Sequence, residues 1–148
     1  MRAVVTRVSS ASVQVEGKTL GRIGQGFLIL LGVGQGDGLP QAEKLAEKIC
    51  GLRIFPNEQG KLDRSLEEIG GQILVISQFT LYGNCKKGRR PEFLSAARPE
   101  TAQALYEEFL RLCRAKGFHV ESGAFGAQML VESVNDGPFT LVLDTSQL

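Results

Sequence analysis

The sequence predicts an α/β fold, with α+β as the alternative, in which layered mixed or antiparallel β-sheets are covered by two main helices. Short apolar or alternating segments recur between turns rich in glycine, of which the chain has 18, and this favours many strands. Two longer segments carry apolar side chains at intervals of three and four residues, as helices covering a sheet do. The length of 148 residues suits one domain over residues 1–148.

The N-terminal part of the chain predicts a meander of strands. Residues 2–8 are rich in β-branched side chains, and residues 12–15 alternate between apolar and polar. Turn residues at 16–18 lead into a strand over 19–23. A further glycine-rich turn precedes the apolar run 27–33, which predicts a buried central strand.

Two segments have helical periodicity. The first begins near Pro40, since proline suits the first turn of a helix, and its apolar face is formed by Ala42, Leu45, Ala46 and Ile49. The second covers residues 101–116, with Pro99 and Glu100 before it and Gly117 at its end. We expect both helices to cover the sheet.

The remaining segments predict short strands and loops. Residues 52–55 and 118–121 read as strands, and residues 57–71 as an ordered surface loop. Residues 72–80 read as a buried strand that becomes polar at its C-terminal end, where sites often lie. Residues 129–134 and 139–143 predict a final hairpin.

The connection of that hairpin, Asn135-Asp136-Gly137-Pro138, has two interpretations. It is either a simple turn, because Asx, glycine and proline are common in turns, or a rigid stretch of bare main chain. In the second case the carbonyls of Gly137 and Pro138 would contact a ligand, helped by a cis peptide bond.

Composition limits the class of protein. The longest apolar run, residues 27–31, is far below the ~20 residues of a membrane helix, and no signal peptide is recognisable, so we expect a cytoplasmic protein with no membrane association. Cys50, Cys85 and Cys113 lie far apart without neighbouring histidines, which indicates reduced thiols and no zinc site. We expect no metal and no cofactor.

The net charge of +1 is not that of a general nucleic-acid-binding protein. However, Lys86, Lys87, Arg89 and Arg90 place four positive charges within five positions. This patch is either a solvated loop or a contact for phosphates.

Common catalytic motifs are missing. His119 is the sole histidine and reads as a structural or surface residue, and no G-x-S-x-G motif occurs. Ser77, Gln78, Phe79 and Thr80 remain as the polar end of a strand, with Ser77 and Phe79 expected on one face and the other two opposite. They either satisfy a strand edge or line an oxyanion hole, which would suffice for an activated substrate.

Two motifs together resemble those of a known family. Ser77-Gln78-Phe79-Thr80-Leu81 and Asn135-Asp136-Gly137-Pro138-Phe139-Thr140 are similar to the S-Q-x-T-L and N-x-G-P-x-T motifs of the D-aminoacyl-tRNA deacylases. The likeness extends to Met1–Ser12, Leu52–Phe55 and Lys87–Pro91. It implies hydrolysis of the ester between a D-amino acid and the terminal adenosine of tRNA, with glycyl-tRNA as a further substrate. It also implies a homodimer with active sites at the subunit interface.

The resemblance assigns roles to residues of both motifs. It implies that Gly137 and Pro138 form a cis dipeptide that enters the partner's active site and excludes L-amino acids, next to Asn135, and that Arg7 orients the dipeptide. Without the resemblance, Arg7 reads as a charge on the exposed face of a strand. Ser77 to Thr80 would form the other wall, with the Phe79 backbone N–H as oxyanion donor. Phe125 and Met129 would line an adenosine pocket, or belong to the core.

Several alternatives stay open. Either Thr80 is the nucleophile or, as we favour because no base is evident, the substrate's ribose 2′-hydroxyl assists water. Leu62 and Glu92 depart from the family pattern, and Glu92 would put a negative charge beside the basic patch. A non-catalytic dimeric module that binds RNA or DNA is the alternative function, and a small-molecule esterase is a third.

Overall fold

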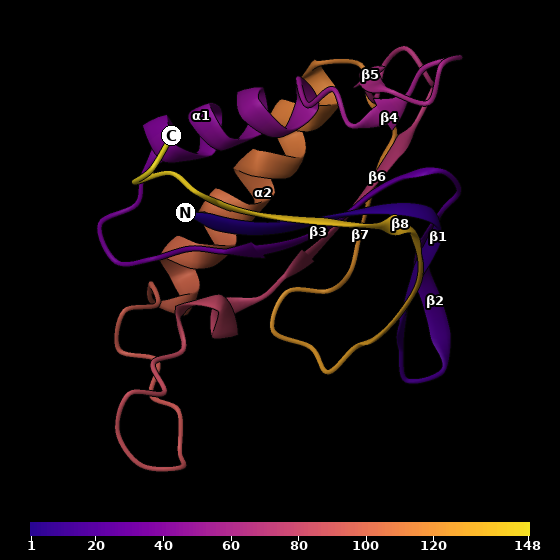
Figure 1. Cartoon of the computed structure of the whole chain (residues 1–148). Coiled ribbons are helices and arrows are strands. Elements are labelled where there is room, and N and C mark those ends of the chain that lie inside the picture. Colours follow the sequence, from indigo (N-terminus) through magenta and orange to yellow (C-terminus); the bar gives the residue numbers. More distant parts are fainter.

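The computed structural model describes residues 1–148 as a large mixed sheet with two helices packed on it (Figure 1). The strands of this sheet are β1 (Arg2–Val15), β2 (Lys18–Ile23), β3 (Gly26–Gly32), β6 (Gln72–Ser77), β7 (Val120–Ser122) and β8 (Leu130–Asp144). A separate small sheet contains β4 (Phe55–Pro56) and β5 (Leu62–Arg64), and the helices are α1 (Leu39–Cys50), α2 (Pro99–Ala115) and the 3-10 helix η1 (Phe79–Tyr82). The predicted fold class is confirmed.

The long strand β1 organises the sheet. Its first half pairs with β3 and its second half with β2, while β8 pairs with it along almost its whole length, all antiparallel. Beyond β3, the strands β6 and β7 are added in parallel. The far end of β2 curls back towards β7. The two strands approach so closely that a Cβ on Gly21 would lie 3.1 Å from the carbonyl oxygen of Ser122. The sheet is therefore nearly closed.

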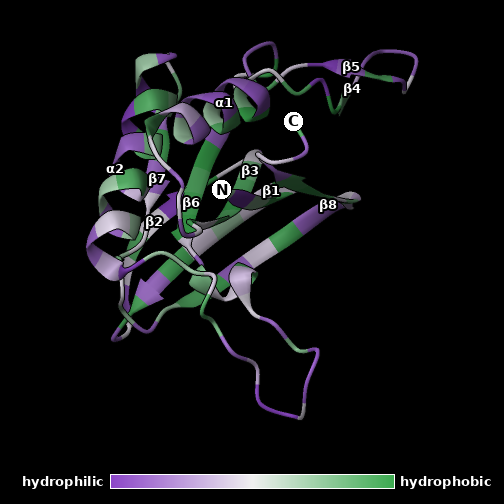
Figure 2. Cartoon of the chain, turned by 90° about the vertical axis from the view of Figure 1, so that its left-hand side faces the viewer, coloured by the Kyte–Doolittle hydropathy of each residue, from purple (hydrophilic) through white to green (hydrophobic).

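The two faces of the sheet bury two separate apolar clusters. Phe27, Ile29 and Leu31 of β3 face the helices together with Ile73 and Val75 of β6, and they pack with the apolar faces of α1 and α2. Leu28 of β3 and Leu74 and Ile76 of β6 alternate with these residues and point to the other face. There they join a second cluster inside the curled sheet, with Val8, Ala11, Val13 and Ile23. Both helices therefore lie on the same face (Figure 2).

Both helices lie where their sequences predict, although α2 starts at Pro99, two residues before the predicted start, and ends at Ala115. Proline occupies the first turn of each helix, and the Gln41 side chain accepts a hydrogen bond from the Gly38 backbone N–H at the start of α1. The face of α1 formed by Ala42, Leu45, Ala46 and Ile49 is buried, as expected. No helix has both the length and the apolar character needed to cross a membrane.

The predicted final hairpin is wrong. Residues 130–144 form the single strand β8, and the chain does not reverse at Asn135–Pro138. Val8 pairs with Asn135 and Thr6 with Thr140, so the four residues 136–139 bulge from the strand opposite Arg7 alone. The turn-forming residues do disrupt the regular ladder, but β1 offers a continuous partner on which the strand resumes its direction.

Two other predicted elements differ from the structure. Residues 52–54 are not a strand, because β4 starts only at Phe55, and its partner β5 lies inside the segment predicted as a loop. The predicted strand over 72–80 ends at Ser77. β7 is offset by two residues from the predicted start of its strand, within the usual uncertainty of element boundaries.

Candidate functional site

The polar motif at the end of β6 turns away from the sheet instead of continuing as a strand. Gln78 makes the last ladder bond, from its backbone N–H to the Leu31 carbonyl oxygen at 2.8 Å, and η1 begins at Phe79. The predicted alternation of Ser77 to Thr80 on two faces is therefore wrong beyond Ser77. No side chain caps η1, so the Phe79 and Thr80 N–H groups have no acceptor within the helix.

Arg2 holds η1 in place. Its Nη1 donates to the Leu81 carbonyl oxygen at 3.0 Å, its guanidinium carbon lies 4.5 Å from the centre of the Tyr82 ring, and its Nε donates to Asp144 Oδ2 at 2.7 Å. Burial raises the pKa of Tyr82, and the hydroxyl donates to Asp37 at 3.3 Å. Arg2 and Asp144, from the two ends of the chain, thus hold the motif in place.

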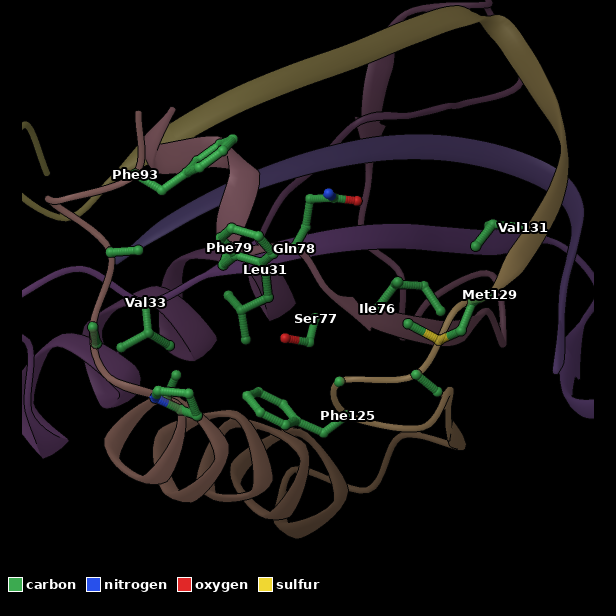
Figure 3. A pocket seen from close by; sticks show the side chains of 16 residues that line it. Leu31, Val33, Ile76, Ser77, Gln78, Phe79, Phe93, Phe125, Met129 and Val131 are labelled. Carbon is green, nitrogen blue, oxygen red and sulfur yellow. The ribbon is translucent and has the colours of Figure 1, made fainter. Parts of the chain in front are cut away.

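An apolar cavity of about 600 Å³ opens between η1, the start of α2 and the segment that follows β7 (Figure 3). Twelve of its 16 lining residues are hydrophobic, and none of the 16 carries a titratable side chain. Ser77, Gln78 and Phe79 contribute to its wall, and Figure 3 shows the Ser77 side chain between Leu31 and Phe125. A cavity of this size and character suits a small organic group.

Thr80 stands apart from the rest of its motif. It does not line the cavity, its side chain is exposed, and its hydroxyl accepts a hydrogen bond from the Gln78 amide. Ser77, by contrast, makes no side-chain hydrogen bond within the chain and faces the cavity. The structure therefore brings three of the four predicted wall residues to one cavity and leaves the fourth beside it.

Phe125 and Met129 both line the cavity, and each also packs against one of the apolar clusters. Phe125 lies 5.9 Å from the ring of Tyr106, whose hydroxyl donates to the Val75 carbonyl oxygen at 2.9 Å. Our sequence reasoning missed Phe93, which lines the cavity and meets Phe79 edge to face at 5.0 Å. The available signal was an aromatic residue directly after residues 86–92, a stretch rich in charged residues.

The second motif forms the bulge of β8. Gly137 and Pro138 are exposed and the peptide bond between them is cis. Gly137 has a φ of 140°, and a Cβ there would lie 2.8 Å from the Phe139 backbone nitrogen, so the position favours glycine. The Asn135 side chain closes the bulge, because its Oδ1 accepts from the Phe139 N–H at 2.9 Å and its Nδ2 donates to Thr140 Oγ1 at 3.2 Å.

Arg7 lies under this bulge and is buried, so its interpretation as an exposed strand charge is wrong. Its Nε donates to the Asp136 carbonyl oxygen at 3.0 Å, and its guanidinium carbon lies 5.0 Å from the centre of the Phe139 ring. None of Arg7, Asn135, Gly137 and Pro138 lines the cavity. Within one chain the two motifs therefore form separate sites.

His119 takes no part in either site. Its side chain is 55% exposed, and its Nε2 lies 2.8 Å from Glu121 Oε1 on the surface. Cys50 and Cys113 are buried, as their positions on the helix faces indicate, and Cys85 is exposed. No histidine or cysteine reaches the cavity.

A family described as D-Tyr-tRNA(Tyr) deacylase matches residues 4–144. A protein of Thermosipho africanus named D-aminoacyl-tRNA deacylase is 53% identical over 148 residues, covering 100% of this chain and 99% of the relative. One of the same name from Koribacter versatilis is 56% identical over 147 residues, covering 99% of each chain.

Among solved structures, a protein titled c-Myc DNA Unwinding Element Binding Protein superposes with a TM-score of 0.91 at 40% identity, covering 97% of this chain and 98% of that one. A probable eukaryotic D-amino acid tRNA deacylase shares the fold, with a TM-score of 0.81 at 21% identity over 96% of this chain and 97% of that one. With both motifs placed and relatives matching from end to end, the chain belongs to the D-Tyr-tRNA(Tyr) deacylase family, whose members include D-aminoacyl-tRNA deacylases.

Proposed function

We propose that this protein hydrolyses the ester of D-aminoacyl-tRNA and releases the free D-amino acid and tRNA, with glycyl-tRNA as a further substrate. The single observation that carries the proposal is the cavity of this family member, which has Ser77, Gln78 and Phe79 on its wall and no titratable side chain. Such a wall suits an ester that is already reactive. The reaction belongs where aminoacyl-tRNA is used, in the cytoplasm.

In the proposed mechanism the enzyme supplies position and an oxyanion donor. The Phe79 N–H, free at the start of η1, donates to the ester oxygen as water adds to the carbonyl carbon. Removing one such donor costs about 2.7–4 kcal/mol of barrier in other enzymes. The ester C–O bond then breaks, and the ribose 3′-oxygen leaves with a proton.

The proton transfers need a group that the cavity wall does not offer. The neighbouring ribose 2′-hydroxyl of the substrate can orient the water and return a proton to the 3′-oxygen. Thr80 is a poorer candidate for the nucleophile, because its hydroxyl is engaged by Gln78 and lies outside the cavity wall. Thr80→Ala should therefore retain most single-turnover deacylation, whereas a substrate ending in 2′-deoxyadenosine should lose nearly all of it.

We further propose that selection against L-amino acids is made by the carbonyls of Gly137 and Pro138, contributed across a homodimer. The exposed bulge, held by Arg7 and Asn135, supports this role, since its main chain is fixed and accessible. β8 also carries the exposed apolar side chains Leu130, Val131, Val134 and Val142, which a partner subunit would cover. Asn135 acts by fixing the bulge.

The decisive experiment is incubation of the purified protein with matched D- and L-aminoacyl-tRNA. Release from the D-form alone supports the proposed class and its stereochemistry together, while equal release from both, or from neither, contradicts it. Sedimentation in the same buffer tests the dimer, because a monomer that still selects D over L would contradict the role of the bulge.

A second candidate is a non-catalytic dimeric module that binds RNA or DNA. It is favoured by the similarity to the c-Myc DNA Unwinding Element Binding Protein, which superposes with a TM-score of 0.91, and by the exposed basic patch Lys86–Arg90. Binding of nucleic acid that weakens with salt, without cleavage of any aminoacyl ester, would select this candidate.

A further inference from the structure

The loop between η1 and α2 has a charged end that the proposed reaction does not use. Residues 83–98 connect the two elements, and every residue from Gly83 to Pro91 is exposed. The loop projects from the body of the molecule (Figure 1), and its far end is hydrophilic (Figure 2). We call residues 85–91 the tip of this loop.

The cations of the tip have no partners within the chain. Lys86, Lys87, Arg89 and Arg90 hold four of the 17 basic residues, and none of their side chains makes an ion pair or hydrogen bond. Because the chain has 16 acidic residues in all, the remainder of the molecule is net negative. The tip is therefore a basic surface on an otherwise acidic molecule, and this charge distribution favours the binding of a polyanion from outside the chain.

Glu92 does not neutralise the tip. Its backbone pairs with that of Asn84 through two hydrogen bonds of 2.8 and 3.1 Å, which close the neck of the loop. Its carboxylate accepts from the Leu94 N–H at 2.9 Å and from Asn84 Nδ2 at 2.6 Å. These hydrogen bonds, the backbone one first, lower the pKa of Glu92. The acidic residue that departs from the family pattern thus shapes the neck.

The neck is joined directly to the rim of the cavity. Phe93 follows Glu92, lines the cavity and packs edge to face on Phe79. On the other side, Gly83 lies so close that a Cβ would come within 3.0 Å of both the Phe93 ring and the Thr80 carbonyl oxygen. Seven tip residues folded back on themselves extend roughly 10 Å beyond the neck. In a bound RNA, a phosphate at the tip would therefore be only a few nucleotides away along the chain from a group in the cavity.

We infer that the tip binds the sugar–phosphate backbone of the tRNA acceptor end and thereby delivers the terminal aminoacyl ester to the cavity. This inference rests on the proposed function and adds a binding surface to it. Cations without internal partners recognise phosphate charge and not base sequence. The tip therefore contributes affinity that depends on salt and leaves the chemistry of the ester unchanged.

The test compares two double variants that each remove two exposed positive charges. Lys87→Gln/Arg89→Gln changes the tip on both sides of Gly88. Lys48→Gln/Lys61→Gln is the matched control, because these exposed lysines lie on α1 and beside β5, at the opposite end of the molecule (Figure 1). Each is assayed on D-aminoacyl-tRNA between 50 and 200 mM salt and on the D-aminoacyl ester of adenosine, which lacks phosphates. Circular dichroism checks folding.

The tip variant should lose roughly tenfold to a hundredfold in kcat/KM on tRNA, and the slope of log kcat/KM against log salt should become shallower by about 1.4–1.8. Hydrolysis of the adenosine ester should be unchanged, and the control should match the unmodified protein on both substrates. Equal loss on both substrates, or no loss on tRNA beyond the control, overturns the inference.

Failure of the proposed function is a separate result. If the unmodified protein cleaves no D-aminoacyl-tRNA, the inference is judged by the binding of uncharged tRNA to the same variants. Weaker binding with a shallower salt slope for the tip variant alone supports a phosphate-binding tip without catalysis. Equal binding by the tip variant and the control overturns it.

Discussion

Arg7 on β1 and Asp136 on β8 are joined twice. The Arg7 Nε donates to the Asp136 carbonyl oxygen at 3.0 Å and lies 3.4 Å from its carboxylate Oδ2. The same guanidinium donates through Nη1 to the carbonyl oxygen of Ile54 at 2.5 Å, while only 9% of the Arg7 side chain is exposed. A buried cation therefore ties the bulge to the segment before β4.

Arg7→Leu should loosen the bulge. The change leaves the buried carbonyl of Ile54 without its donor, which costs about 1–3 kcal/mol, and removes the donor of the partly exposed Asp136 carbonyl, which costs less. We expect a lower free energy of unfolding in urea and, under the proposed function, faster release from L-aminoacyl-tRNA relative to D. Arg111→Leu removes an exposed ion pair with Glu108 and is the matched control. Unchanged D-to-L selection in a folded Arg7→Leu protein would contradict the role of Arg7.

Asn135 should act through its side-chain oxygen. Asn135→Ala removes the acceptor of the Phe139 N–H, which should cost about 1 kcal/mol and reduce D-to-L selection. Asn135→Asp keeps an acceptor at the same position and should retain most of the selection. The ratio of the two deacylation rates measures the effect, and equal ratios for both variants would rule out this contact as the cause.

Asp144 should make stability depend on pH in the acid range. Burial alone would raise its pKa, but hydrogen bonds from Arg2 and Ser146 outweigh burial and lower the pKa to about 2 from 3.8. A lowered carboxyl pKa stabilises the folded state above the unfolded value, and this contribution disappears as the pH falls from about 4 to about 2.

Asp144→Asn should therefore destabilise the protein at pH 6 by roughly 2 kcal/mol or less, and by much less near pH 2. Urea unfolding of both proteins at several pH values measures the difference. A difference that stays constant from pH 6 to pH 2 would contradict the linkage.

The thiols should react unequally. Cys50 and Cys113 are buried between α1 and α2 with their sulfur atoms 3.8 Å apart, and Cys85 is exposed. The hydrogen bond with Cys50, and then burial, raise the pKa of Cys113. A thiol reagent should modify Cys85 rapidly in the folded protein and all three cysteines in denaturant. Rapid modification of Cys113 in the folded state would show that the helix pair opens.

Local patterns predicted the helices and the central strands well, because Ala42, Leu45 and Ile49 or the run 27–33 carry their periodicity in neighbouring residues. The path of the chain after Ser77 and at Asn135–Pro138 was mispredicted. In both places the outcome depends on a partner far away in sequence: Arg2 beneath η1, and β1 beside the bulge.

The same distinction applies to the site. Motif likeness identified Ser77, Gln78, Phe79, Phe125 and Met129, all of which line one cavity. It did not identify Phe93 or the pairing of Asn84 with Glu92, because both depend on how the loop folds back on itself. Nor could the sequence show that Arg7 is buried, since its burial depends on contacts with Asp136 of β8 and Ile54 before β4, both distant in sequence.

Because β8 pairs with β1 both before and after residues 136–139, neither arm of the bulge can swing independently of the sheet. How far the bulge extends from the sheet is therefore set by the number of residues between its two paired ends, Asn135 and Thr140. This number is fixed by the sequence, so thermal motion does not change it. Substitutions in neighbouring loops should leave that reach intact, whereas inserting or deleting one residue between Asn135 and Thr140 should change it in a single step.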